Sequence, residues 1–229
     1  MKQSSAVKSF INAPYLLWSV LFIIAPMIMV VYYAFTDRNG DWTLANITAL
    51  SAYSQTFIRS IWYAFVATLI CLVLAYPLAY IMSRSSMSKQ RTIMMLVMLP
   101  MWMNFLIRTY SWITLLANTG IINTLLSKIG IGPLHMINTP GAVILGMVYN
   151  FLPYMILPIY SIMSKLDYRL VEAAQDLGCN SFGVLKRVIF PLSLPGVISG
   201  ITMVFVPSVS TFYISQKLGG GKYLLVGDS

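Results

Sequence analysis

The chain has 229 residues, of which 58% are hydrophobic and only 9% are charged, and its formal net charge is +9. Soluble domains carry roughly 25% charged residues, so this composition excludes a water-soluble enzyme and indicates an integral membrane protein. A spanning helix needs about 20 apolar residues, and the length therefore allows five or six spans and little else.

Five apolar runs predict an all-α integral membrane fold, a polytopic helical bundle with five spans. In chain order they cover residues 14–35, 57–82, 92–116, 140–163 and 191–214. The last four contain the interior prolines Pro77, Pro100, Pro153, Pro158, Pro195 and Pro207. Lipid cannot replace the backbone hydrogen bonds that proline removes, so these spans are expected to pack against one another or to line a cavity.

The basic residues divide unequally between the loops of the two sides. One side collects Lys2, Lys8, Arg84, Lys89, Arg91, Lys165, Arg169, Lys186 and Arg187; the other collects Arg38, Lys128, Lys217 and Lys222. Because short cytoplasmic loops are enriched in lysine and arginine, this split predicts a cytoplasmic N-terminus.

The loop over residues 164–190 is the longest on the predicted cytoplasmic side. Asp167 can cap a helix over residues 168–177, and Gly178 can end it in a left-handed conformation. Asn180 or Ser181 can cap a second short helix that ends at Arg187, before Pro191 opens the fifth span. From composition alone, this element is either an interfacial helix pair or a docking surface for a partner.

The spacing of Glu172-Ala173-Ala174, Gly178 and Val188-Ile189-Phe190-Pro191 resembles the EAA loop of ABC-importer permeases. Val188 and Phe190 are mild departures from that pattern. Three further segments resemble the spermidine/putrescine subgroup of the family: residues 99–112, 120–126 and 149–154. Family members have six spans, so the resemblance implies that the last one is missing here. It also implies an N-terminal part, residues 1–56, and a core permease domain, residues 57–229.

The resemblance implies a permease subunit of the bacterial inner membrane that forms half of a polyamine pathway. Its expected partners are a second permease subunit, two copies of an ATPase subunit and a periplasmic binding protein. Carried over residue by residue, Glu172, Ala173, Ala174, Asp176 and Gly178 would couple the chain to the ATPase. The chain has no G-x-x-x-x-G-K loop, so ATP and Mg²⁺ are expected on the ATPase and no cofactor on this chain. No nucleic-acid partner and no metal site are expected.

The residues of the pathway are less sharply marked by the sequence. Asn104 and Arg108 share a helix face by spacing, as do Asn150 and Tyr154. The polar side chains could contact cargo or form interhelical hydrogen bonds. Trp102 and Tyr149 could present ring faces to an ammonium group or serve as packing aromatics.

No aspartate or glutamate falls within a predicted span. Arg108 would repel a polycation, so it is expected to be structural and hydrogen-bonded to carbonyls. The polyamine assignment thus rests on the resemblance. The alternatives are an ABC permease for another small cargo, such as an amino acid, and an ATP-independent channel. A membrane enzyme would need paired acids or an activated nucleophile, and none is apparent.

Overall fold

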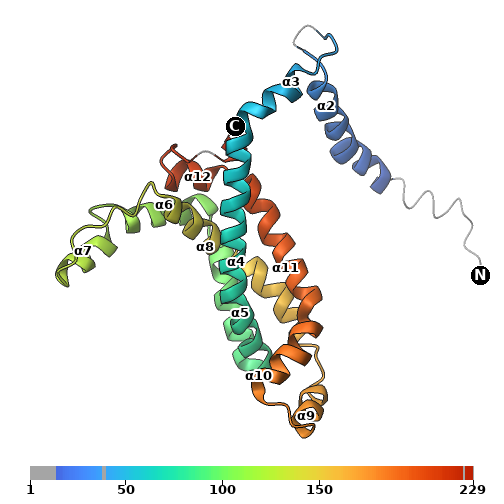
Figure 1. Cartoon of the computed structure of the whole chain (residues 1–229), viewed down its shortest axis with the longest axis vertical. Coiled ribbons are helices and arrows are strands. Elements are labelled where there is room, and N and C mark those ends of the chain that lie inside the picture. The colour runs from blue at the N-terminus through green and yellow to red at the C-terminus, as the bar shows by residue number, and fades with distance from the viewer. Residues whose placement is uncertain (1–13, 38–39, 224, 229) are drawn as a thin grey trace, which may run out of the picture. The chain divides into compact units, whose positions relative to one another are not determined.

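A computed structural model describes residues 14–37, 40–223 and 225–228. The chain divides into two compact units, residues 1–55 and residues 56–229 (Figure 1). Four helices are long and apolar enough to cross a membrane, and a strongly bent helix pair makes five if it counts as one span. The predicted all-α membrane fold is therefore confirmed.

The first unit contains an apolar helix over Pro14–Ala34, which agrees with the first predicted span. Its central part is a π-helical turn, η1 (Val20–Ile24), followed by α2 (Ala25–Ala34). None of the side chains in its most apolar stretch is buried inside the chain, so this helix is free to face lipid or another subunit. The short helices α3 (Ala45–Ala49) and η2 (Leu50–Tyr53) follow. Lys2, Lys8 and Arg38, which entered the prediction of sidedness, lie outside the described residues.

The second unit is built on three long helices that run alongside one another (Figure 1). These are α4 (Ser54–Arg84), α8 (Pro140–Met163) and α11 (Phe190–Ser210). The shorter helices are α5 (Met87–Trp102), α6 (Phe105–Leu116), α7 (Ile121–Lys128), α9 (Arg169–Asp176), α10 (Ser181–Val184) and α12 (Tyr213–Leu218), with the turns η3 (Leu185–Ile189) and η4 (Val226–Asp228). In this unit α9 and α12 lie at opposite ends of the bundle (Figure 1).

The third predicted span, expected as one helix over residues 92–116, is broken in the structure. Helix α5 ends at Trp102, and the segment Phe105–Lys128 departs from it at 91°. Pro100 lies in the last turn of α5, and Met103 has an extended backbone. Asn104 then caps α6, because its side-chain oxygen accepts a hydrogen bond from the Leu106 amide at 2.8 Å. A side-chain cap four residues after a proline favours a new helix over continuation of the old one.

Helices α8 and α11 pack closely because glycine lies where their backbones meet. A Cβ atom at Gly196 would stand 2.8 Å from the Pro158 carbonyl oxygen, and one at Gly200 would stand 3.2 Å from the carbonyl oxygen of Met155. Small residues at such positions let two membrane helices approach, so that van der Waals contact holds them together.

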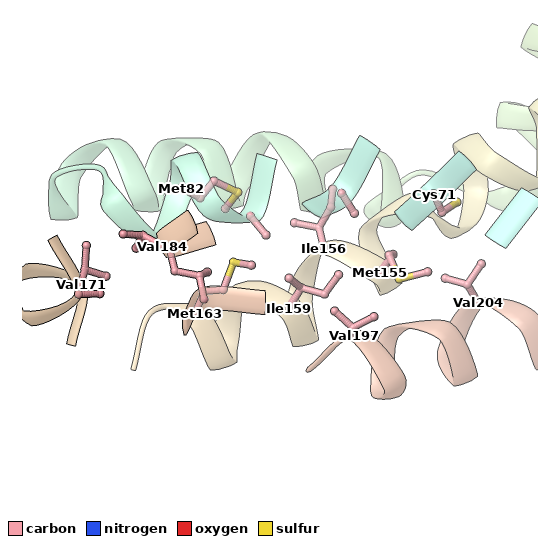
Figure 2. Close-up of a cluster of buried hydrophobic side chains, with 14 residues drawn as sticks. Cys71, Met82, Met155, Ile156, Ile159, Met163, Val171, Val184, Val197 and Val204 are labelled. Carbon is pink, nitrogen blue, oxygen red and sulfur yellow. The ribbon is translucent and has the colours of Figure 1, made fainter. Parts of the chain in front are cut away.

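A buried apolar cluster extends along α4, α8 and α11. Figure 2 shows Ile156 and Ile159 near its centre, between Val171 of α9 at one end and Cys71 and Val204 at the other. Two side-chain hydrogen bonds also join the helices. The hydroxyl groups of Tyr76 and Ser193 bond α4 to α11 at 3.1 Å, and the Tyr160 hydroxyl of α8 donates to Gln90 of α5 at 2.7 Å. The core therefore connects the loop that follows α8 to the middle of the bundle.

Candidate coupling site and translocation path

Helix α9 forms nearly where the sequence predicts it, over Arg169–Asp176. The Asp167 carboxylate accepts a hydrogen bond from the Arg169 amide at 3.0 Å, although Tyr168 occupies the capping position itself. Glu172 lies in the first turn, where the helix dipole favours a negative charge.

Gly178 ends α9 in the left-handed conformation, with φ +83°, as predicted. The Gly178 amide donates to the Gln175 carbonyl at 2.8 Å, and the Cys179 amide donates to the Ala174 carbonyl at 3.0 Å. This pair of bonds is the Schellman motif, which satisfies the last carbonyls of a helix and sets a sharp change of direction.

The helix after this turn is longer than predicted. Of the two predicted caps, Asn180 and Ser181, Asn180 is the one that accepts from the Gly183 amide, at 2.8 Å. One continuous helix then runs from Ser181 to Ser210. The prediction of a separate short helix ending at Arg187 was wrong.

The π-helical turn η3 lies just before Pro191, as η1 lies just before Pro26. A wider turn accommodates the proline ring that would otherwise clash with a carbonyl of the preceding turn, so the helix continues.

The predicted coupling residues lie on two sides of α9. Glu172, Ala173, Asp176 and Gly178 are exposed, and the neighbouring Leu177 side chain is 87% exposed. Val171 and Ala174 are buried in the apolar cluster instead.

A groove of about 410 Å³ borders this exposed face. It is lined by Leu170, Ala173, Ala174 and Leu177 from α9 and by Arg187, Val188, Pro191 and Leu192 from η3 and α11. One side of α9 is thus anchored in the core while the other presents small, apolar and acidic side chains outward.

The five predicted path residues do not form one cluster of contacts. Trp102 ends α5 with 79% of its surface exposed, and Asn104 serves as the cap of α6 rather than a mid-helix group. Tyr149 meets Trp112 edge to face, with ring centres 5.4 Å apart. Tyr154 is exposed beside Phe151.

Asn150 is buried in α8. Its amide nitrogen donates to the Gly146 carbonyl at 2.8 Å, whereas its side-chain oxygen has no hydrogen-bond partner among the described residues. That oxygen is a free acceptor inside the bundle, and a buried acceptor without a partner is costly.

Arg108 is buried in α6, with 8% of its surface exposed. The expected hydrogen bonds to carbonyls are absent for two of its atoms, because Nε and Nη1 have no partner within the described part of the chain. The guanidinium lies 5.9 Å from the centre of the Phe105 ring, which offers a weak cation–π contact.

A second cation–π contact, at the other end of the bundle, was not predicted from the sequence. Arg84, in the last turn of α4, lies 5.8 Å from the Tyr80 ring centre and 4.8 Å from the Tyr168 ring centre. The spacing of Tyr80 and Arg84 by four residues was a signal for half of this arrangement. Nothing in the sequence indicated that Tyr168 would complete it. Within the described residues, no group of three or more His, Cys, Asp or Glu could hold a metal ion.

Residues 75–228 match the family model of the binding-protein-dependent transport system inner membrane component. The chain belongs to this family. Its relatives include the spermidine/putrescine transport system permease protein PotB of Haemophilus influenzae, 42% identical over 92% of this chain and 77% of that protein. The same protein of Escherichia coli K12 is 38% identical over 92% of this chain and 80% of its own length.

The fold is also that of solved transporter chains. A chain of a bacterial ABC transporter that imports the acidic polysaccharide alginate superposes with a TM-score of 0.65 at 18% identity, over 95% of this chain and 86% of that one. At that identity the likeness concerns the fold alone. Membership of the family confirms the resemblance read from the spacing of Glu172, Gly178 and Pro191.

Proposed function

We propose that this chain is the permease subunit of an ATP-driven importer and forms half of the pathway for spermidine and putrescine. The observation that carries the proposal is the exposed face of α9, which is fixed by a Schellman turn to the 30-residue helix Ser181–Ser210. The cargo is inferred from relatives named as spermidine/putrescine permeases that share 38% to 42% of residues over most of the chain.

In this proposal α9 seats in an ATPase subunit. Ala173 allows close approach, Glu172 and Asp176 offer charges, and Leu177 supplies an apolar contact. The turn at Gly178 transmits the movement of α9 to α11. ATP and Mg²⁺ act in the ATPase pair, and the permease itself performs no catalysis.

The remaining parts of the assembly follow from the family. A second permease subunit completes the pathway, and a periplasmic binding protein delivers cargo to the outer face. The chain crosses the bacterial inner membrane several times with its N-terminus in the cytoplasm. Residues 57–229 form the core domain, and residues 1–56 add the first span and the first external loop.

The pathway residues proposed from the sequence are Trp102, Asn104, Tyr149, Asn150 and Tyr154, with Arg108 as a structural charge. Asn150 has the best structural support, because its free side-chain oxygen can accept a hydrogen bond from an ammonium group.

If mid-depth aromatic residues also line the path, the double variant Trp102→Ala, Tyr149→Ala should lose spermidine uptake. Intact uptake would remove both from the pathway.

Reconstitution tests the function and the cargo together. The chain is assembled in proteoliposomes with its second permease, ATPase and binding protein, and uptake of labelled spermidine, putrescine and a panel of amino acids is measured with and without ATP. ATP-dependent uptake of the polyamines alone supports the proposal. Preferential uptake of an amino acid would favour the alternative cargo, and uptake without ATP would favour a channel.

A further inference from the structure

The Arg84 guanidinium lies over two tyrosine rings that come from different parts of the fold, and these three side chains are called the stack below. Tyr80 lies one turn earlier on α4, whereas Tyr168 immediately precedes α9. The distances of 5.8 Å to the Tyr80 ring centre and 4.8 Å to the Tyr168 ring centre are within the range of a cation–π interaction. The nearer ring is therefore the one that belongs to the α9 segment.

Few other groups compete for this guanidinium. Arg84 is half-buried, and its Nε atom is buried without a hydrogen-bond partner among the described residues. Arg84 also lies in the last turn of α4, where the helix dipole favours a positive charge. The dipole and the two rings together account for its position.

The space around this stack is open. A cavity of about 730 Å³ lies beside it, where the end of α4 faces α9 and α10. Its lining includes Tyr80, Arg84 and Tyr168, together with Ile81, Ser83, Val171, Gln175 and Ser181. Apolar contact near α9 comes from Val171 and Ala174, and Val171 lies at the very end of the buried cluster (Figure 2). The Arg84–Tyr168 contact thus lies beside the buried cluster and joins the end of α4 to the segment that leads into α9.

We propose that Arg84 and Tyr168 form a second coupling connection, which passes movement of α9 to α4. The inference rests on the proposed function, because it assigns α9 a driven movement. The turn at Gly178 connects α9 to α11 through the backbone, and the Arg84–Tyr168 contact connects α9 to α4 through side chains. With both connections, α4 and α11 move together when α9 is displaced. Arg84 and Tyr168 are positioning residues in this scheme.

The test compares Tyr168→Leu, which removes the ring, with Tyr168→Phe, which keeps it, in the reconstituted complex. The measured quantity is spermidine transported per ATP hydrolysed, because a fall in the amount of folded complex lowers both rates and leaves this ratio unchanged. We expect Tyr168→Leu to lower the ratio about two- to fivefold, as loss of one partly exposed cation–π contact implies, and Tyr168→Phe to retain it.

Arg84→Gln is a second variant, which removes the cation instead of the ring. It tests the same contact if Tyr168→Leu does not fold. It should lower the ratio as Tyr168→Leu does, and the double variant should be no worse than either single one. An unchanged ratio in Tyr168→Leu and Arg84→Gln would overturn the inference, as would an equal fall in Tyr168→Phe. Absence of ATP-dependent polyamine uptake in the unaltered complex would instead overturn the proposed function.

Discussion

At the scale of single residues, glycine and arginine have the largest consequences in this chain. Gly178 has φ +83° and open space around its Cα, so its role is conformational rather than steric. Arg108 is buried without partners for two of its nitrogens, so its charge is poorly compensated within the described residues. Gly178 therefore sets the direction in which the chain leaves α9. Arg108 destabilises the fold, because its buried charge lacks partners.

Exchange of Gly178 for valine should stop uptake while the chain still inserts. A β-branched residue in the left-handed region costs roughly 1–2 kcal/mol, and relief of that strain would turn α9 away from its orientation. Gly130→Val is a matched control, because Gly130 has φ +80° and equally open surroundings at the end of α7. Both variants should lose similar stability in a thermal unfolding assay, and only Gly178→Val should lose uptake. Normal uptake by Gly178→Val would remove this turn from the coupling scheme.

Arg108→Met should leave the thermal stability of the detergent-purified chain unchanged or raise it. Replacement of even a buried ion pair by well-packed apolar side chains is often neutral or stabilising, by about 1–4 kcal/mol, and a poorly compensated single charge should be at least as easy to replace. The lost contact with Phe105 offsets about 2 kcal/mol of that gain, the value for a desolvated cation–π contact. Arg108→Lys keeps the charge and should bring no gain. A clear fall in melting temperature for the methionine variant would show that the guanidinium has a stabilising partner.

At the scale of elements, the structure depends on how helices end and how closely they meet. Pro100 and Asn104 together end α5 and start α6, whereas η3 lets the helix from Ser181 continue through Pro191. Prolines in similar apolar surroundings therefore have opposite effects. Pro77, Pro153 and Pro207 also lie inside continuous helices, without a preceding π-helical turn, so proline alone does not end a helix in this chain. The side-chain cap at Asn104 distinguishes the break between α5 and α6.

Gly196→Ala should weaken the packing of α8 against α11. Its Cβ atom would lie 2.8 Å from the Pro158 carbonyl oxygen and 3.1 Å from the Ile159 Cα, and backbone atoms cannot easily move aside. Overpacking of this kind costs about 1–3 kcal/mol, measurable as a lower melting temperature in detergent. Gly141→Ala adds the same methyl group to α8, where the nearest atom is 3.8 Å away, and should not destabilise. Equal stability of the two variants would show that the close approach is not needed.

At the scale of the whole molecule, the order of helices fixes which surfaces lie on opposite sides of the membrane. Helix α7 precedes α8 and α9 follows it, and α8 has 24 residues of high hydropathy. If α8 spans the membrane, α7 and α9 face different compartments. The basic residues around α9 predict that it faces the cytoplasm.

Cysteine labelling tests this arrangement in a background without Cys71 and Cys179. A Leu177→Cys variant should react with a membrane-impermeant maleimide only from the cytoplasmic face, because the Leu177 side chain is 87% exposed. Bound ATPase should protect it. A Leu125→Cys variant in α7, where the native side chain is 57% exposed, should react from the outer face. Reaction of both cysteines from one face would contradict the topology, and labelling of Leu177→Cys in the assembled complex would contradict the docking role.

The sequence by itself determined the membrane class, the first and fourth spans almost to the residue, and the helix and glycine turn around Gly178, with Asn180 or Ser181 as the next cap. These features depend on apolar length and on residues adjacent in the chain, which act locally. Only the tertiary structure decided that Ala174 faces the core while Ala173 faces outward, that the third span breaks after Trp102, and that Tyr168 meets Arg84. The break in the third span depends on competition between local preferences, and the other two outcomes depend on contacts between residues far apart in sequence. The spacing of residues within one segment does not encode such competition or such contacts.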